Sequence, residues 1–524
     1  MLEKIYSNSV LLGDTSPNGW GIKYATEFHM TNDSKLFPPR TEWESKGYRP
    51  DEYSRWIKGN WQERTEQSPA PLGCKRVDIP EGIFLSRCGK NYIQEDEIAT
   101  DEFKDKRGDK ITGPALALPV YEGRMIGLFD FSQKGWVSGK GRSAVWTEVD
   151  WPAKEIRPQY LMSTSNYMAS IHDSDDERDW ASECWALSKL AMNTTSFMDI
   201  GSATNERTMI ASPAMLCPYG NSAPLFRANK RRVLLSSILA STVYDFMTRF
   251  RCSGLHLNWC VVEETALPFL NSSLEQAICA LAFRLYGASP HFASERIRFN
   301  YQSINLFAIA AHERLRCEVL LTAMVAIACN IELDDFKWMH RECDIPTEKL
   351  TSNQFTRSLP PKGFWRTDKG QRPELRRTVL AQVAFADALA AKSTSPVELI
   401  GYLLNQNDGD GWQLPEQLRL SDYGLGHDAR AREYQPVREC FGPRFYDWQL
   451  EQSAEESWRE CHLHARNLLG PTGYASLLAE LTGDSNTASS PESSSMKELA
   501  PAPPRRGKAA KPTPLFDNLD DLGG

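Results

Sequence analysis

A run that mixes aromatic, basic and glycine residues lies at residues 118–146, LPVYEGRMIGLFDFSQKGWVSGKGRSAVW. Cations neutralise phosphates, glycine lets a backbone approach closely, and aromatic faces stack on a base or a sugar, so this mixture suits nucleic acid. The cations of the run are Arg124, Lys134, Lys140 and Arg142. Composition leaves a second interpretation open, in which the run is a tight, glycine-rich β-hairpin whose cations only keep it soluble.

A second group of hydrogen-bonding side chains lies in DIGSATNERTMIAS, residues 199–212, where Asn205, Glu206, Arg207 and Thr208 follow one another. The paired donors and acceptors of Asn and Arg fit the edges of adenine and guanine, and Glu can accept from cytosine. From spacing alone, a turn that hydrogen-bonds its own backbone is the simpler explanation. The spacing therefore does not assign these residues to a ligand.

Motifs of several enzyme classes are absent from the sequence. An adenosylmethionine-dependent adenine methyltransferase needs a glycine-rich loop after a strand and a polar-Pro-Pro-aromatic loop. The closest glycine string, residues 135–142, has no convincing strand and helix around it, and Pro-Pro occurs only in FPPR, LPPK and APPR. The phosphate-binding pattern GxxxxGK[ST] is also missing. We predict no catalytic and no cofactor-binding residues in this chain.

Metal-binding patterns are equally weak. Residues 97–106, EIATDEFKDK, carry the residue types of a Mg²⁺-dependent nuclease in the wrong order, and we interpret them as a solvated charged loop. His312 and Glu313 lack the second histidine of HExxH. The 12 cysteines are scattered singly, without a CxxC pair. We predict no metal site and reduced cysteines.

The elements that must position these residues change in type along the chain. Short apolar runs separated by Gly, Pro, Trp and Tyr predict short strands in the first third, and periodic apolar stretches predict long helices at 306–339 and 373–391. Between them we expect two strands around a turn at 201–205, a helix at 228–250 and a strand at 255–264.

The sequence therefore predicts an α+β protein, in which a β-rich region is followed by an all-helical domain and a disordered tail. The tail is expected to be disordered because it contains too few apolar residues to offset its ordering entropy. The expected parts are 1–180 (β-rich), 181–272 (strands plus a helix), 273–481 (helical) and 482–524 (tail).

The overall composition is that of a soluble globular protein of 524 residues, with 41% hydrophobic and 24% charged residues. There is no apolar stretch of about 20 residues and no secretory signal pattern, so we expect a cytoplasmic protein without membrane contact. The net charge of −8 neither supports nor excludes DNA, because a binding face can be basic on an acidic protein.

Several motifs occur in a recognisable order over residues 1–270: MTNDSKLF, the run at 118–146, RPQYLM, DIGSATNERTMIAS, SSILASTVYDFMTRFRCSGLHLNW and ALP. This series resembles the region after the catalytic domain in type IIG restriction-modification proteins and in the adenine-specific DNA methyltransferases of BREX and DISARM phage-defence systems. In that family the region is the target-recognition domain, which reads DNA sequence.

Members of the family normally carry their methyltransferase loops upstream of this region, and this chain begins where those loops end. The resemblance implies either a separate specificity subunit or the C-terminal piece of a split gene. The implied partners are double-stranded DNA, an adenine-specific methyltransferase subunit that binds S-adenosylmethionine, and other defence-system proteins. The alternatives are a divergent complete DNA methyltransferase and a structural assembly subunit of a defence complex.

By matching position, the resemblance implies that Tyr121 and Arg124 begin the recognition domain and that Asn205, Arg207 and Thr208 lie close to the DNA. Glu122 and Glu206 have a second interpretation, as partners of Arg124 and Arg207 in internal salt bridges. Motifs shared by proteins that read different sequences are expected to be structural or to contact phosphates. The expected DNA-binding residues, with the cations of the first run included, are Tyr121, Arg124, Lys134, Lys140, Arg142, Asn205, Arg207 and Thr208.

Overall fold

The structure is a computed structural model of the chain. It describes residues 1–524 except 105–109, 172–192, 230, 428–430, 432, 434 and 483–524. The predicted disordered tail therefore lies outside the described residues, apart from its first position.

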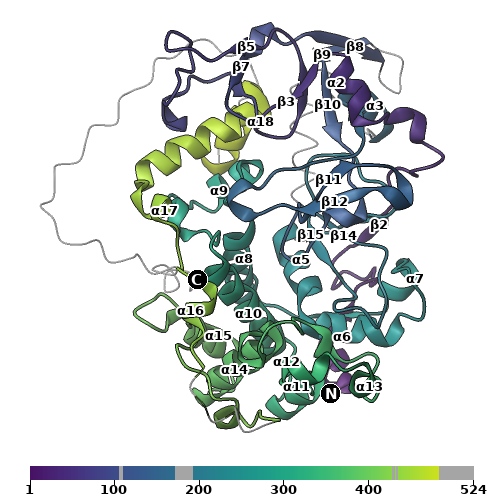
Figure 1. Cartoon of the computed structure of the whole chain (residues 1–524), viewed down its shortest axis with the longest axis vertical. Coiled ribbons are helices and arrows are strands. Elements are labelled where there is room, and N and C mark those ends of the chain that lie inside the picture. The colour runs from purple at the N-terminus through teal and green to yellow at the C-terminus, as the bar shows by residue number, and fades with distance from the viewer. Residues whose placement is uncertain are drawn as a thin grey trace, which may run out of the picture.

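The predicted α+β class is confirmed, with small antiparallel sheets in the N-terminal half and helices in the C-terminal half (Figure 1). The first four-stranded sheet has the order β13-β10-β4-β3 and the second the order β15-β14-β16-β2. The strands of the first sheet are β13 (Leu161–Ser163), β10 (Leu116–Pro119), β4 (Trp56–Lys58) and β3 (Tyr48–Pro50). Those of the second are β15 (Ala211–Pro213), β14 (Thr194–Phe197), β16 (Leu225–Arg227) and β2 (Lys23–Ala25).

The remaining strands form a three-stranded sheet and three two-stranded ones. In the order in which they pair, they are β5 (Gln62–Glu63), β7 (Asn91–Gln94) and β6 (Ile83–Leu85); β8 (Thr100–Lys104) and β9 (Lys110–Pro114); β11 (Lys134–Ser138) and β12 (Val145–Glu148); and β1 (Ser9–Leu11) and β17 (Ala266–Pro268). The β1–β17 pair joins the start of the chain to the end of the β-rich half.

Helices pack on both four-stranded sheets and form the C-terminal half. Those up to residue 300 are α1 (Leu2–Ser7), α2 (Arg40–Ser45), α3 (Thr164–Ile171), α5 (Arg232–Ala240), α6 (Thr242–Arg251), α7 (Trp259–Val262), α8 (Ser272–Tyr286) and α9 (Ala293–Arg298). Those beyond it are α10 (Ala311–Ala328), α11 (Leu333–Met339), α12 (Thr347–Leu350), α13 (Asn353–Thr356), α14 (Arg377–Ala390), α15 (Pro396–Asn405), α16 (Arg438–Phe441), α17 (Asp447–Glu451) and α18 (Ala454–Thr482).

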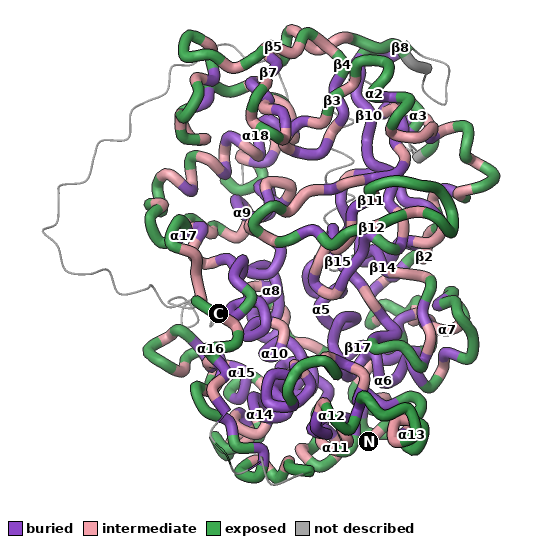
Figure 2. Tube along the Cα trace, in the orientation of Figure 1, coloured by how far each residue is buried: buried purple, intermediate pink, exposed green. Residues whose placement is uncertain are grey.

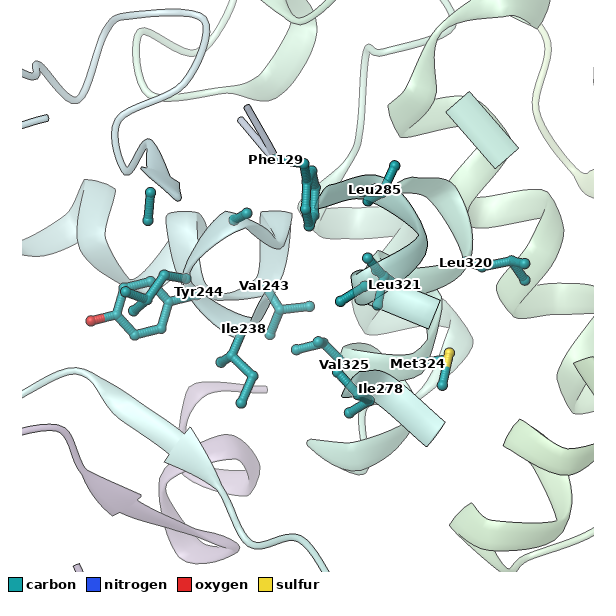
Figure 3. Packing of buried hydrophobic residues seen from close by; sticks show 14 of the residues in the cluster. Phe129, Ile238, Val243, Tyr244, Ile278, Leu285, Leu320, Leu321, Met324 and Val325 are labelled. Atoms are coloured by element: carbon teal, nitrogen blue, oxygen red, sulfur yellow. The ribbon is translucent and has the colours of Figure 1, made fainter. Parts of the chain in front are cut away.

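The main hydrophobic core crosses the predicted boundary at residue 272, because a single cluster runs from Ile5 to Val437. Figure 3 shows its centre, which contains Phe129 of the β-rich half together with Ile238, Val243 and Leu321. The ring of Phe129 lies 6.5 Å from that of Tyr286 in α8. Burial of this cluster supplies the main favourable free energy of folding. The loop that contains Phe129 is therefore anchored directly to the helices.

Helix α10 also carries charges into this core. Glu313 is fully buried and accepts hydrogen bonds from Arg284 at 2.5 Å, from Arg316 at 2.9 Å and from Arg444 at 2.8 Å. Burial alone would raise the pKa of Glu313, but the arginines outweigh it and lower the pKa to about 2. Glu313 therefore has a structural role.

The last described helix returns to the β-rich half. A break at Gly470, where φ is 69°, divides α18, and its first part lies against the sheets near β3 and β7 (Figure 1). Asn467 donates to the hydroxyl of Tyr53 at 3.3 Å, and His464 lies 3.0 Å from the same oxygen. The helical half is thus tied to the first sheet as well as to the second.

Local predictions had mixed outcomes. The turn at 201–205 is confirmed, since it lies between the antiparallel strands β14 and β15. The predicted helix at 228–250 is two helices, because Ser241 ends α5 and its side chain accepts from the backbone N–H of Tyr244 at the start of α6. The predicted helix at 306–339 is divided at Asn330, whose φ is 53°.

The predicted strand at 255–264 is wrong. Residues Trp259–Val262 form the short helix α7, and the strand comes later, at Ala266–Pro268. The apolar residues that suggested a strand include Val262, which is buried, and Trp259, whose ring lies 5.8 Å from that of Tyr24. A single helical turn satisfies both contacts. Across the described residues, none of the helices is long and apolar enough to cross a membrane.

Candidate nucleic-acid interface

The glycine-rich run forms a β-hairpin. Strands β11 and β12 pair antiparallel with Trp136 opposite Trp146, and a bulge follows Trp136. The connecting loop contains Gly139 and Gly141, whose φ angles are +78° and +54°. A Cβ atom at Gly139 would lie 2.2 Å from the carbonyl oxygen of Ser143, so this position requires glycine. The glycines of the run therefore shape the hairpin loop.

The hairpin carries free cations at its tip. Figure 2 shows that the β11–β12 hairpin is largely exposed. Lys140 and Arg142 are exposed in its loop and form no ion pair with any described residue. Lys134 is half-buried and lies opposite the exposed Glu148 in the strand register. Lys140 and Arg142, the two cations of the hairpin that have no acidic residue opposite them, therefore lie at its tip. They are accessible to a polyanion.

The other face of the hairpin rests on the segment that leads to β13. The backbone N–H of Trp136 donates to the carbonyl of Arg157 at 2.8 Å, and the side chain of Gln159 donates to the carbonyl of Gly139 at 3.2 Å. The guanidinium of Arg40 lies 4.6 Å from the centre of the Trp136 ring, a cation–π contact. These contacts fix the direction in which the hairpin projects.

The NERT segment, Asn205–Thr208, is held by a single buried carboxylate on α6. Asp245 accepts from the Arg207 guanidinium at 2.7 Å and from the backbone N–H groups of Thr208 and Met209 at 3.0 Å each. Burial would raise the pKa of Asp245, but Arg249 and Arg207, with the backbone donors, keep it below its ordinary value. Asp245 is therefore a charged group at neutral pH inside the protein.

The same segment contacts the helical half. The carbonyl oxygen of Glu206 accepts from Arg249 at 2.6 Å and from the Thr367 hydroxyl at 3.1 Å. Its carboxylate accepts from the backbone N–H of Asp368 at 2.9 Å. Glu206 thus does not pair with Arg207, as one interpretation of the sequence expected. It joins the NERT segment to the chain before α14.

A polar cleft of about 490 Å³ brings the two sequence blocks together. Leu128, Asp130 and Gln133 line it from the middle of the first block, and Asn205, Glu206, Arg207 and Ile210 line it from the second. Trp151 and the helical residues Arg314, Glu318 and Arg377 complete the lining. Regions about 70 residues apart in the sequence therefore meet at one surface feature.

The arginines on the helical side of the cleft are held by contacts with other residues of the protein. The guanidinium of Arg314 lies 3.6 Å from the centre of the Trp151 ring and donates to the carbonyl of Phe129 at 2.9 Å. Arg377 pairs with Glu318 at 3.0 Å and with Asp368 at 2.9 Å. In contrast, the exposed amide of Asn205 makes no side-chain hydrogen bond to the described part of the chain. Asn205 is therefore available to a ligand at the mouth of this cleft.

The predicted site residues fall into two groups. Arg124, Lys140, Arg142 and Asn205 are exposed, and Lys134 is half-buried. Tyr121, Arg207 and Thr208 are buried: Tyr121 stacks on Tyr219 with ring centres 4.7 Å apart, and the other two bind Asp245. In this conformation the side chains of Tyr121 and Thr208 are inside the fold, and Arg207 lines the cleft only as a buried side chain whose guanidinium is bound to Asp245.

Glu122, the neighbour of Tyr121, is half-buried, and burial raises the pKa of its carboxyl to about 7 although Arg124 opposes the rise. One carboxylate oxygen has no hydrogen-bond donor among the described residues. Glu122 and Arg124 do not form the salt bridge that one interpretation of the sequence expected. Arg124 lowers the pKa of the Glu122 carboxyl only as a nearby charge.

Sequence reasoning missed Asp245 and Arg249. Asp245 is the only acidic residue between 232 and 251, in a segment that is otherwise mostly apolar. A carboxylate inside an apolar helix must find donors, so its position was a usable signal of a buried ion pair. Its partner was not predictable from spacing, because Arg207 lies 38 residues earlier.

Comparisons of the chain with protein-family models, with curated proteins and with solved structures give no match. A metal-binding group of three or more His, Cys, Asp or Glu side chains is likewise not found among the described residues.

We predict that Asp245→Asn destabilises the protein by about 3–5 kcal/mol, because it leaves Arg207 and Arg249 buried without a counter-charge. Asp422→Asn is the matched control, since Asp422 is half-exposed and pairs with Arg419 on the surface, and it should cost less than about 1 kcal/mol. Urea denaturation measures both. Similar small losses for the two variants would contradict the structural role of Asp245.

Proposed function

We propose that this chain is the DNA target-recognition part of an adenine-specific DNA methyltransferase system of the restriction-modification or phage-defence type, which acts in the cytoplasm. The observation that carries the DNA-binding part is the pair of unpartnered cations Lys140 and Arg142 on a projecting hairpin. The exposed amide of Asn205 lies on a cleft that is also lined by residues 128–133, which come just before this hairpin in the sequence. The ordered motifs described above supply the methyltransferase context.

The two features divide the work of recognition in a physically reasonable way. Cations at a hairpin tip contact phosphates, which gives affinity and orientation without sequence information. An amide with a free donor and a free acceptor is suited to a base edge, above all to adenine. Arg207 and Thr208 support the segment from inside, in line with the argument that shared motifs are structural.

The catalytic step is assigned to another chain. The sequence lacks both loops that an adenine methyltransferase uses for its cofactor and for the flipped base, so S-adenosylmethionine is proposed to bind the partner. This chain would contribute DNA affinity and target choice. The methyltransferase subunit would contribute the reaction, with other defence-system proteins as further partners.

The DNA-binding part is tested by the double substitution Lys140→Gln and Arg142→Gln. We expect weaker binding to a fluorescent duplex, and a plot of log K against log salt that is less steep by about 2, because each lost phosphate contact removes about 0.9 from the slope. The control is Arg357→Gln, because Arg357 is exposed and makes no ion pair with a described residue, yet lies in the segment after α13, far from the hairpin (Figure 1). Unchanged affinity and slope in the double variant would refute the proposed role of the hairpin.

The methyltransferase part is tested by methyl transfer from labelled S-adenosylmethionine to duplex DNA. We expect no transfer and no cofactor binding by this chain alone, and adenine methylation once an adenine-specific methyltransferase encoded beside it is added. Calorimetric binding of S-adenosylmethionine to the purified chain would instead favour a complete, divergent methyltransferase. Complex formation with partner proteins in the absence of any DNA binding would favour an assembly subunit.

A further inference from the structure

A second cavity, also of about 490 Å³, is lined by three arginines. Arg49 comes from β3, Arg87 from the turn between β6 and β7, and Arg157 from the segment before β13. A bridge between Asp51 and Ser86 holds two of these segments together. The fold thus gathers three guanidinium groups from distant parts of the β-rich half.

The charges of this cavity are unbalanced. Its only acidic lining residue is Glu155, which pairs with both Arg87 and Arg157. Arg49 is exposed and forms no ion pair with a residue that the structure describes. Three positive charges therefore share one negative charge, and the guanidinium groups repel one another. An anion with several oxygen atoms would relieve this repulsion and accept paired N–H donors from more than one arginine.

The cavity is continuous with the base of the hairpin. Arg157 lines the cavity with its side chain, and its carbonyl accepts from the backbone N–H of Trp136 in β11 at 2.8 Å. A Cβ atom at Gly135 would lie 2.5 Å from the Cβ of Arg157, so glycine allows the hairpin to pack this closely. A nucleic-acid strand that contacts Lys140 and Arg142 and follows the hairpin toward its base would therefore pass Arg157 further along its backbone.

We propose that the cavity formed by Arg49, Arg87 and Arg157 binds a phosphate group of the DNA backbone beside the strand contacted by the hairpin. This inference rests on the proposed DNA binding and adds a specific anion site to it. The arginines supply the positive charge and the fork of donors, and Glu155 holds Arg87 and Arg157 in place. The site contributes affinity and orientation, and it reads no base.

The reactivity of Cys88 can report whether a ligand occupies this cavity. Cys88 lines the cavity and is exposed, and a hydrogen bond with the Ser86 hydroxyl lowers the pKa of its thiol. Alkylation by N-ethylmaleimide proceeds through the thiolate, so its rate at Cys88 reports whether the cavity is covered. Cys260 and Cys440 are also exposed and lie elsewhere, so they serve as internal references in the same mass-spectrometric measurement.

The experiment compares alkylation of the full chain in sodium chloride, in sodium phosphate of equal ionic strength and with a saturating DNA duplex. We expect DNA to slow alkylation of Cys88 at least about 3-fold, without an effect on Cys260 and Cys440, and phosphate to slow it at high concentration. In Arg49→Gln the chain should still bind DNA, with less protection of Cys88 and a salt slope lower by about 1. Arg357→Gln should behave as the unchanged protein does.

The outcomes separate the two proposals. If DNA binds, as fluorescence anisotropy reports, and Cys88 reacts as fast as in chloride, the phosphate site is refuted while the proposed function stands. If inorganic phosphate protects Cys88 but no duplex binds, the cavity binds free phosphate. In that case both the binding of a DNA phosphate in the cavity and the proposed function are refuted. If neither ligand protects Cys88 and no duplex binds, both proposals fail.

Discussion

The arrangement of the interface depends on one buried carboxylate, that of Asp245. It accepts from Arg207 and from two successive backbone N–H groups of the NERT segment, and Arg249 lies beside it on the next turn of α6. A buried charge with this many donors allows few alternative conformations, since each donor would lose its partner if the segment moved. The exposed Asn205 therefore sits on a rigid base, and its place at the cleft follows from the packing of α6.

The hairpin obeys a different constraint. Its strands are short and its tip is exposed, so its direction comes from the contacts of Trp136 and Gly139 with the segment beneath it. That segment continues into the first sheet, whereas the NERT segment belongs to the second sheet and to the helices. The proposed DNA surface thus spans both sheets. The main hydrophobic core, which contains Phe129, joins the second sheet to the helices (Figure 3), whereas buried residues of the first sheet, such as Leu118 and Met162, lie in separate clusters.

The sequence predicted the α+β class and the exposed cations of the hairpin loop, because both depend on local composition. It also left open whether the glycine-rich run was a nucleic-acid contact or only a tight hairpin. The structure confirms the hairpin geometry, and the two interpretations are compatible at Lys140 and Arg142. The burial of Tyr121, Arg207 and Thr208 was not predictable, because it depends on Tyr219 and Asp245, which are distant in the sequence. The arginine cavity escaped prediction for the same reason, since Arg49, Arg87 and Arg157 are scattered singly along the chain.

Hydrogen–deuterium exchange of the full chain, with and without a saturating duplex, tests the central claim most directly. The account predicts slower exchange at residues 133–148 and 202–206 when DNA is present, and unchanged exchange at α12 and α13, which lie away from the hairpin (Figure 1). Peptides of α6 that contain Asp245 should exchange slowly in both states, because they are buried before DNA binds. Protection confined to the helical half, with the hairpin and the NERT segment unaffected, would contradict the account.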